Sequence, residues 1–231
     1  MTHPLAEFES IYIINLPSRA DRRSEIGAQL ARIGLSLDAP GVNIFPAVRP
    51  ADAGPFSSIG ARGCFMSHLG VLKAATGRRN VLILEDDLDF VDNISAPNLP
   101  VDWGMFYGGA RHELETSGPL TAAPPSAGLG CTHFVAINGG LIADLAAYLE
   151  AMLARPAGDP AGGPMHVDGA YSHFRADHPD VVTYVATPEL GFQRPSRTDI
   201  HALPWFDRTP GVREVVQWIR RQRSSGSTRK A

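Results

Sequence analysis

An apolar run that ends in three adjacent carboxylates constrains the fold of this chain more than any other segment. Residues 80–84 read Asn-Val-Leu-Ile-Leu, and Glu85, Asp86 and Asp87 follow at once. A continuous run of this kind indicates a strand buried on both faces, as in the middle of a parallel sheet. Ligands of open α/β sheets bind beyond the carboxyl ends of the strands, so the triplet is predicted to face a binding site.

The three carboxylates also indicate what binds there. Neighbouring like charges repel one another, and a bound divalent cation is the simplest relief. Hard cations such as Mg²⁺ and Mn²⁺ prefer oxygen ligands. Glu85, Asp86 and Asp87 are therefore predicted to form one wall of a metal or phosphate–metal site. The alternative interpretation is an acidic turn whose carboxylates lie in water.

Predicted strands and helices alternate along the chain. Besides residues 80–84, apolar runs predict strands over residues 10–16, 42–48, 102–109, 131–138 and 181–186. Helical spacing predicts helices that start at a capping-box-like Ser18 and Asp21, then over residues 63–75, after residue 138 and over residues 166–176. This alternation predicts one α/β domain with a mainly parallel central sheet flanked by helices.

The remaining segments are predicted to be loops and a tail. Glycine and proline cluster in residues 97–130 and 154–164, which are expected to form long loops, and residues 191–210 are expected to be irregular. The domain is predicted to cover residues 1–210. Residues 211–231 are predicted to form a basic amphipathic helix and a flexible basic tail.

Composition excludes several function classes. The net charge of -3 argues against a general nucleic-acid binder. The two cysteines, Cys64 and Cys131, are too few for a disulfide framework or a cysteine-based zinc site, and both are expected to be buried in a reducing compartment. The chain shows no signal-peptide pattern at its start and no apolar run long enough to span a bilayer. A cytoplasmic location is therefore expected.

Two further clusters are candidates for the same site. Asn15, Arg19 and Arg23 lie around the start of the first predicted helix, where backbone N–H groups and arginines suit a phosphate or diphosphate. The alternative is a solvated helix start with surface arginines.

The other cluster surrounds the second predicted helix. Gly60 and Gly63 allow close backbone approach to a ligand, and Ser67 and His68 are expected in the first helical turn, within reach of it. The alternative for His68 is a structural histidine.

The motifs occur in a recognisable order. It runs Ile-Ile-Asn-Leu at 13–16 with arginines at 19, 22 and 23, Gly-Cys-x-x-Ser-His at 63–68, Leu-Glu-Asp-Asp at 84–87, Ala-Ile-Asn-Gly-Gly at 136–140, Val-Asp at 167–168 and Pro-Glu-Leu-Gly-Phe-Gln at 188–193. This set resembles glycosyltransferase family 25, the bacterial lipooligosaccharide galactosyltransferases related to collagen galactosyltransferases. The resemblance spans about residues 10–200.

The resemblance implies a GT-A-like fold, a UDP-sugar donor that is often UDP-galactose, and Mn²⁺ or Mg²⁺. Glu85 and Asp87 hold the Asp-x-Asp spacing of such enzymes, with Asp86 between them. Asp87 is expected to bind the metal directly, and Glu85 or Asp86 to contact the ribose or a metal-bound water.

The resemblance assigns the donor pocket as well. Asn15, Arg19 and Arg23 are expected to line the nucleotide pocket, with Ser67 and His68 beside it.

The family implies an inverting displacement at the anomeric carbon. Asp168 is the expected base that takes the acceptor proton; the alternative is a helix N-cap. His201 is a candidate second metal ligand, or else an ordinary loop histidine. Gln193 and Asp199 are expected to contact donor or acceptor, and Trp205 to stack on a sugar.

The expected function is transfer of a hexose, with galactose the sugar that the resemblance implies, from a UDP-sugar to a saccharide or glycolipid acceptor in lipopolysaccharide or other surface-glycan synthesis. The basic terminal helix is expected to touch the anionic inner face of the cytoplasmic membrane. One alternative is a degenerate relative that binds a nucleotide-sugar or glycan without transfer. Another is a receiver-like phosphotransfer domain, although such domains usually carry their key aspartate on the first strand, which here ends in Asn15.

Overall fold

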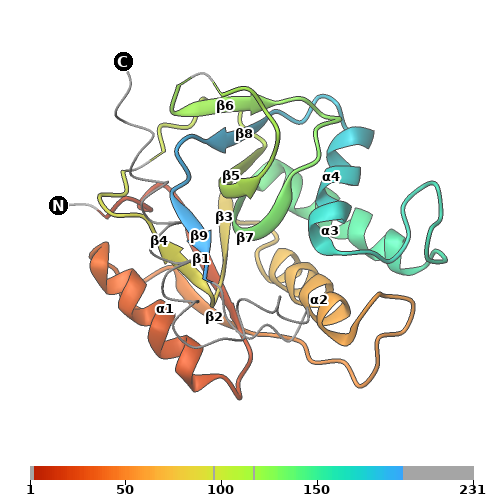
Figure 1. The fold of residues 1–231 in the computed structure, drawn as a ribbon, viewed down its shortest axis with the longest axis horizontal. Coiled ribbons are helices and arrows are strands. Elements are labelled where there is room, and N and C mark those ends of the chain that lie inside the picture. Colours follow the sequence, from red (N-terminus) through yellow and green to blue (C-terminus); the bar gives the residue numbers. More distant parts are fainter. Residues whose placement is uncertain (1–2, 96, 117, 195–231) are drawn as a thin grey trace, which may run out of the picture.

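The strand that ends in the acidic triplet lies inside a seven-stranded sheet in the computed structural model, which describes residues 3–95, 97–116 and 118–194 (Figure 1). The sheet order is β2-β1-β3-β7-β5-β8-β6. The strands are β1 (Ser10–Asn15), β2 (Val42–Pro46), β3 (Asn80–Glu85), β5 (Met105–Arg111), β6 (Leu120–Ala123), β7 (Gly130–Asn138) and β8 (Thr183–Ala186). The pairings show that β1, β2, β3, β5 and β8 point one way and that β6 and β7 point the other. The predicted mainly parallel α/β sheet is confirmed.

Helices cover both faces of the sheet. One hydrophobic cluster joins the sheet to α1 (Ala20–Arg32) and includes Ile26 and Leu30. The other joins the opposite face to α2 (Ile59–Ala74), α3 (Gly139–Leu153) and α4 (Val167–Asp177). Figure 1 shows α1 on its own side and α2, α3 and α4 grouped on the other.

The apolar run of β3 is continuous because both faces of that strand are buried. Val81 and Ile83 belong to the cluster under α2 and α3, and Leu82 and Leu84 belong to the cluster under α1. All four side chains are fully buried. Alternate side chains of a strand point to opposite faces, so each half of the run stabilises a different layer.

A second, two-stranded sheet lies next to the acidic triplet. β4 (Leu88–Phe90) pairs antiparallel with β9 (Gly191–Gln193). The residues just after the triplet are thereby tied to a segment about a hundred positions later in the chain. The prediction that residues 191–210 are irregular is wrong for β9; residues 195–210 lie outside the described residues.

Three local predictions differ from the structure. α1 begins after Arg19, and no side chain caps it, so the predicted capping box of Ser18 and Asp21 is absent. α2 begins at Ile59 rather than at residue 63, because the Ser58 hydroxyl accepts a hydrogen bond from the Ala61 N–H at 3.0 Å. Residues 97–130 are not only loop, since they contain the whole of β5 and β6.

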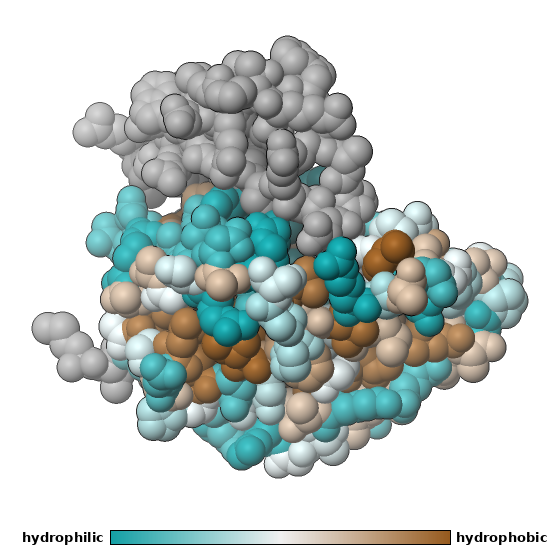
Figure 2. Space-filling model, turned by 90° about the horizontal axis from the view of Figure 1, so that it is seen from below, coloured by the Kyte–Doolittle hydropathy of each residue, from teal (hydrophilic) through white to brown (hydrophobic). Residues whose placement is uncertain are grey.

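No helix among the described residues is long and apolar enough to cross a membrane. On the face shown in Figure 2, hydrophobic residues lie in separate patches between hydrophilic ones. The predicted domain boundary at residue 210 and the predicted helix over residues 211–223 lie outside the described residues.

Candidate functional site

The acidic triplet lies where several strand ends meet. Ile14 of β1 pairs with Glu85 of β3, so the next residue of each strand, Asn15 and Asp86, also lie side by side at this edge. β7 runs antiparallel to β3 and β5, so its first residues, from Gly130, reach the same edge. Side chains from both the parallel and the antiparallel part of the sheet therefore converge here.

Asp86 is held by two donors. Its carboxylate accepts a hydrogen bond from Asn15 Nδ2 at 2.7 Å and from Arg22 Nη1 at 2.9 Å. Burial raises the pKa of Asp86, against the opposing effects of Asn15 and Arg22. Because Asp86 and Asp87 are both buried, the alternative of an acidic turn in water is wrong.

Among the described residues, the carboxylate of Asp87 accepts fewer hydrogen bonds than that of Asp86. Its Oδ2 accepts a hydrogen bond from Gln193 Nε2 at 3.2 Å and lies 3.8 Å from Arg22 Nη1. Its Oδ1 is buried and has no hydrogen-bond partner among the residues that the structure describes. Burial, with the negative charge of Glu85 next, raises the pKa of Asp87 to about 7. A buried carboxylate with an open lone pair is a good ligand for a cation.

Glu85 has different partners from these two aspartates. Its Oε1 accepts a hydrogen bond from Thr132 Oγ1 at 2.8 Å and lies 3.4 Å from His68 Nε2. Burial acts to raise the pKa of Glu85, but the contacts with His68 and Thr132 outweigh it and the pKa is lowered. Glu85 therefore favours its ionised form.

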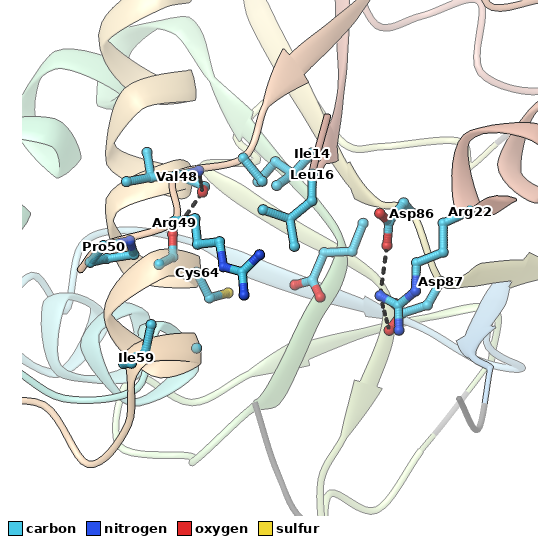
Figure 3. A pocket seen from close by; sticks show the side chains of 15 residues that line it. Ile14, Leu16, Arg22, Val48, Arg49, Pro50, Ile59, Cys64, Asp86 and Asp87 are labelled. Atoms are coloured by element: carbon cyan, nitrogen blue, oxygen red, sulfur yellow. Dashed lines mark hydrogen bonds and ion pairs between the residues drawn. The ribbon is translucent and has the colours of Figure 1, made fainter. Parts of the chain in front are cut away.

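A first cavity of about 270 Å³ opens beside the triplet. Figure 3 shows Cys64 and Arg49 on one side of it and Arg22, Asp86 and Asp87 on the other. The cavity thus has one arginine, Arg22, next to the carboxylates and another, Arg49, across from them.

The outer wall of this first cavity is apolar. Val48 and Ile59 line it and are 37% and 45% exposed. Among the described residues, Val101 is the only other large hydrophobic side chain with such exposure. Exposed apolar side chains at the mouth of a charged cavity suit a ligand with one flat apolar part and one anionic part.

A second cavity of about 390 Å³ lies on the other side of Glu85. It shares only Cys64 and Glu85 with the first. Further side chains that can exchange protons or donate hydrogen bonds there come from β5, β7, the N-cap and first turn of α4, the segment before β9 and β9 itself; they include Arg111, His133, His166, Asp168, Glu189 and Gln193.

Asp168 lies in the first turn of α4 at this second cavity. Its Oδ2 accepts a hydrogen bond from the Cys131 N–H at 3.3 Å, and its Oδ1 accepts one from the Gly169 N–H at 2.8 Å. The N-cap of α4 is His166, so the alternative that Asp168 caps the helix is wrong.

The backbone around the second cavity is irregular. Cys131 has a φ of 72°, in the left-handed region that side chains rarely adopt. The β5–β7 register shifts on both sides of Gly109, which marks a bulge. A Cβ on Gly109 would lie 2.2 Å from the Gly191 carbonyl oxygen and 2.5 Å from His133 Nε2, so only glycine fits.

His133 is buried on β7 with one nitrogen engaged. Its Nε2 lies 3.2 Å from the Gly191 carbonyl oxygen, and its Nδ1 has no hydrogen-bond partner among the described residues. Burial lowers the pKa of His133, so the ring favours its neutral form.

The predicted donor residues are placed as follows. Asn15 Oδ1 accepts a hydrogen bond from Arg23 Nε at 3.1 Å, Arg19 pairs with Asp21, and neither Arg19 nor Arg23 lines the first cavity. Arg22 reaches the aspartates instead. Sequence reasoning missed it because three arginines share one helical turn.

Ser67 and His68 are not in the first turn of α2 but in its third, since that helix begins at Ile59. Ser67 Oγ donates to the Gly63 carbonyl at 2.7 Å and accepts from the Val48 N–H at 2.8 Å. Gly63 itself packs against Val48, whose carbonyl oxygen would lie 2.6 Å from an added Cβ. These residues fix the wall of the first cavity.

Gln193 reaches Asp87, as described above. Asp199, His201 and Trp205 lie outside the described residues. Thr132 and His133 were missed because they sit inside an apolar strand run, and Arg49 because nothing in its sequence context marks it.

Comparison with known proteins gives two related human sequences. The chain is 30% identical to procollagen galactosyltransferase 2 over 151 residues, which is 53% of this chain and 24% of that protein. It is 30% identical to inactive glycosyltransferase 25 family member 3 over 104 residues, which is 37% of this chain and 18% of that protein. The matches thus span about a quarter or less of each relative's length. The predicted resemblance to glycosyltransferase family 25 is confirmed over this part of the chain.

Comparisons with protein-family models and with solved structures gave the following results. No protein-family model matches the chain. A solved glycosyltransferase involved in glycosylation of the major capsid of PBCV-1 is 12% identical, with a TM-score of 0.34 over 78% of this chain and 93% of that one.

Proposed function

From this similarity to glycosyltransferase 25 family members, which supports a role in glycosyl transfer, we propose that the chain moves a hexose, galactose in the first instance, from a UDP-sugar to a saccharide acceptor. The observation that carries the proposal is the Glu85–Asp86–Asp87 motif, in which both aspartates are buried and Glu85 lines two cavities of different chemistry. One cavity suits a nucleoside diphosphate and the other suits the reacting sugars.

The first cavity is the proposed donor nucleotide site. A uracil ring fits against the apolar surface of Val48 and Ile59. Arg22 and Arg49 line the same cavity and are suited to the diphosphate, because guanidinium groups bind phosphate oxygens in a bidentate manner.

Asp87 and Glu85 are the proposed ligands of Mn²⁺ or Mg²⁺, with His201 as a further candidate. The residues fit such an ion: Asp87 Oδ1 is a buried acceptor without a described partner, and the donor set is made of carboxylate oxygens. When bound, the cation would neutralise negative charge on the leaving diphosphate. Gln193 and Arg22 hold the Asp87 side chain in place for it.

The transfer step is proposed to occur in the second cavity. The acceptor hydroxyl oxygen forms a bond to the anomeric carbon while the bond from that carbon to UDP breaks, and UDP leaves with the electron pair. The hydroxyl proton passes to the Asp168 carboxylate, which two backbone N–H groups orient. A single displacement of this kind inverts the anomeric centre.

The proposed setting is surface-glycan synthesis at the cytoplasmic face of the membrane. A lipid-linked acceptor would bring the reaction to an anionic surface, which the basic segment over residues 211–223 could contact.

A binding-only relative is the second candidate function. Arg22 already pairs with Asp86 and lies near Asp87, and one of the two related proteins is named as inactive. An arginine beside the aspartates could replace the cation and leave binding without turnover.

The test is UDP release from a panel of UDP-sugars, with and without Mn²⁺, for the wild type and Asp87→Asn. We expect Mn²⁺-dependent release from one donor and a loss of about 100-fold or more in the variant. Asp92→Asn is the matched control, because Asp92 is 90% exposed and lies outside the cavities. Mn²⁺-dependent binding without release, tested with an acceptor panel, would favour the binding-only relative.

A further inference from the structure

Three side chains with metal-binding atoms meet in the partition between the two cavities. Cys64 and His68 are four residues apart on α2, so they lie on one face of that helix, and Glu85 faces them from the end of β3. One ligand atom from each residue lies within 4.8 Å of the other two. We propose that Cys64, His68 and Glu85 bind a zinc-class ion, a divalent cation that prefers thiolate and imidazole ligands.

The distances suit such an ion. Zinc binds sulfur, nitrogen and oxygen at about 2.3, 2.0–2.1 and 2.0–2.2 Å, so neighbouring ligand atoms of a tetrahedral site lie about 3.3–3.7 Å apart. His68 Nε2 and Glu85 Oε1 are 3.4 Å apart. The Cys64 sulfur lies within 4.8 Å of a ligand atom of each of the other two residues.

His68 provides independent evidence for a ligand. The side chain is fully buried, yet its Nε2 has no hydrogen-bond partner within the part of the chain that the structure describes. That nitrogen points toward Glu85 across a separation typical of two ligands of one ion. Apart from this 3.4 Å approach to Glu85, the buried nitrogen makes no hydrogen bond among the described residues, and a bound cation would satisfy it.

Neighbouring residues orient the ligands. His68 Nδ1 lies 3.0 Å from Tyr171 Oη, and when Nδ1–H donates to that oxygen, Nε2 presents its lone pair to the cation. Thr132 Oγ1 donates to Glu85 Oε1 and fixes the carboxylate. Such outer contacts distinguish a prepared site from three residues that happen to be close.

This site shares Glu85 with the one proposed at Asp87, but its other ligands are a thiolate and an imidazole. Thiolate and imidazole select zinc-class ions, whereas Mn²⁺ and Mg²⁺ prefer oxygen ligands only. Binding would release the Cys64 thiol proton to solvent. Three protein ligands leave a fourth position open, and Cys64 and Glu85 both line both cavities, so that position faces them.

Co²⁺ is the probe that tests the site, because a cobalt–thiolate bond gives a charge-transfer absorption band. We expect the full chain to show this band at one equivalent of Co²⁺ and to lose it when Zn²⁺ is added. Cys64→Ser should abolish the band. Cys131→Ser is the matched control for the other cysteine and should retain it, and Asp87→Asn should retain it because Asp87 is not a ligand.

Tyr171→Phe keeps all three ligands and tests the site without removing one. We expect Co²⁺ affinity to fall by about tenfold or more, in line with the loss of an outer-shell partner. Circular dichroism would show that each variant is folded. The proposal is wrong if the wild type shows no thiolate band, or if the band survives in Cys64→Ser and disappears in Cys131→Ser.

An ion in this position would also occupy Glu85, which is a proposed ligand of the Mn²⁺ site. On the basis of the proposed function, Zn²⁺ should inhibit UDP release by the wild type and by Cys131→Ser to the same extent, whereas Cys64→Ser should lose this sensitivity. The cobalt spectrum needs no turnover, so failure of the transferase proposal and failure of the metal site are seen separately.

Discussion

The two cavities beside Glu85 are built from different parts of the sheet. The first lies over the carboxyl ends of the parallel strands β1 and β3 and has an apolar wall with Arg22 and Arg49. The second lies at the bulged end of β5 and the start of the antiparallel strand β7, and its walls carry side chains that can exchange protons. The regular half of the sheet thus offers a binding surface, and the irregular half offers chemical groups.

Asp168→Asn is the strongest test of this division. It removes the proposed base from the second cavity, so kcat should fall by about 100-fold or more while the affinity for UDP stays the same. Steady-state kinetics and calorimetric UDP titration measure the two effects. Asp177→Asn, at the exposed far end of α4, is the control. An equal loss of UDP affinity would show that the two cavities do not have separate roles.

Gly109→Ala should disturb the second cavity and the fold together. The new Cβ would collide with the Gly191 carbonyl and with His133, and crowding of this kind costs about 1–3 kcal/mol of the free energy of unfolding. Urea unfolding measures it. Gly128→Ala is the matched control, because nothing lies within 4 Å of an added Cβ there. Equal stability of the two variants would contradict the close approach of β5 and β9.

Arg49→Gln should affect only the first cavity. Loss of one charged contact to the diphosphate should weaken UDP binding by about tenfold and leave kcat at saturating donor nearly unchanged. Calorimetric titration with UDP measures it. Arg62→Gln provides a control, since Arg62 pairs with Asp52 and lines neither cavity. Undiminished UDP affinity would remove Arg49 from the donor site.

The metal-free protein should show a pH dependence that comes from Asp87. Its folded pKa of about 7 lies above the ordinary value of 3.8, so the folded state binds the proton more tightly and stability falls as pH rises from about 4 to 7. Asp87→Asn removes this loss. In the presence of a chelator its Tm should therefore exceed that of the wild type by a few degrees at pH 8, with the gap closing toward pH 4. Thermal unfolding of both proteins at several pH values measures the gap, and a constant gap would contradict the raised pKa.

The sequence predicted the sheet because its signals are strong and local. The buried run of β3 and the apolar face of α3 each continue long enough to identify the element. Helix starts were less certain: Ser58 is a good cap, but the glycines that follow it suggested a loop. β6 was missed because its four residues lie among prolines and glycines.

The site could be predicted only in part for a different reason. The acidic triplet can be recognised in the sequence alone. The residues that contact it come from distant segments, and only the fold shows which they are. Arg22, rather than Arg19 or Arg23, pairs with Asp86 because its side chain leaves α1 toward the end of β3. The sequence context of His133 is that of a buried strand, and only the structure shows that its side chain lines the second cavity beside the bulge of β5.

The pairing of β4 with β9 has a consequence for synthesis of the protein on the ribosome. Asp87 and Leu88 emerge long before Gln193, which is 106 residues away from Asp87 and is the residue that donates to it. Until β9 is made, the edge of β4 has no partner strand and the Asp87 carboxylate lacks that donor. The candidate site is therefore completed only when nearly all of the described chain has been translated, so a nascent chain that stops before residue 191 carries the acidic motif in an unfinished form.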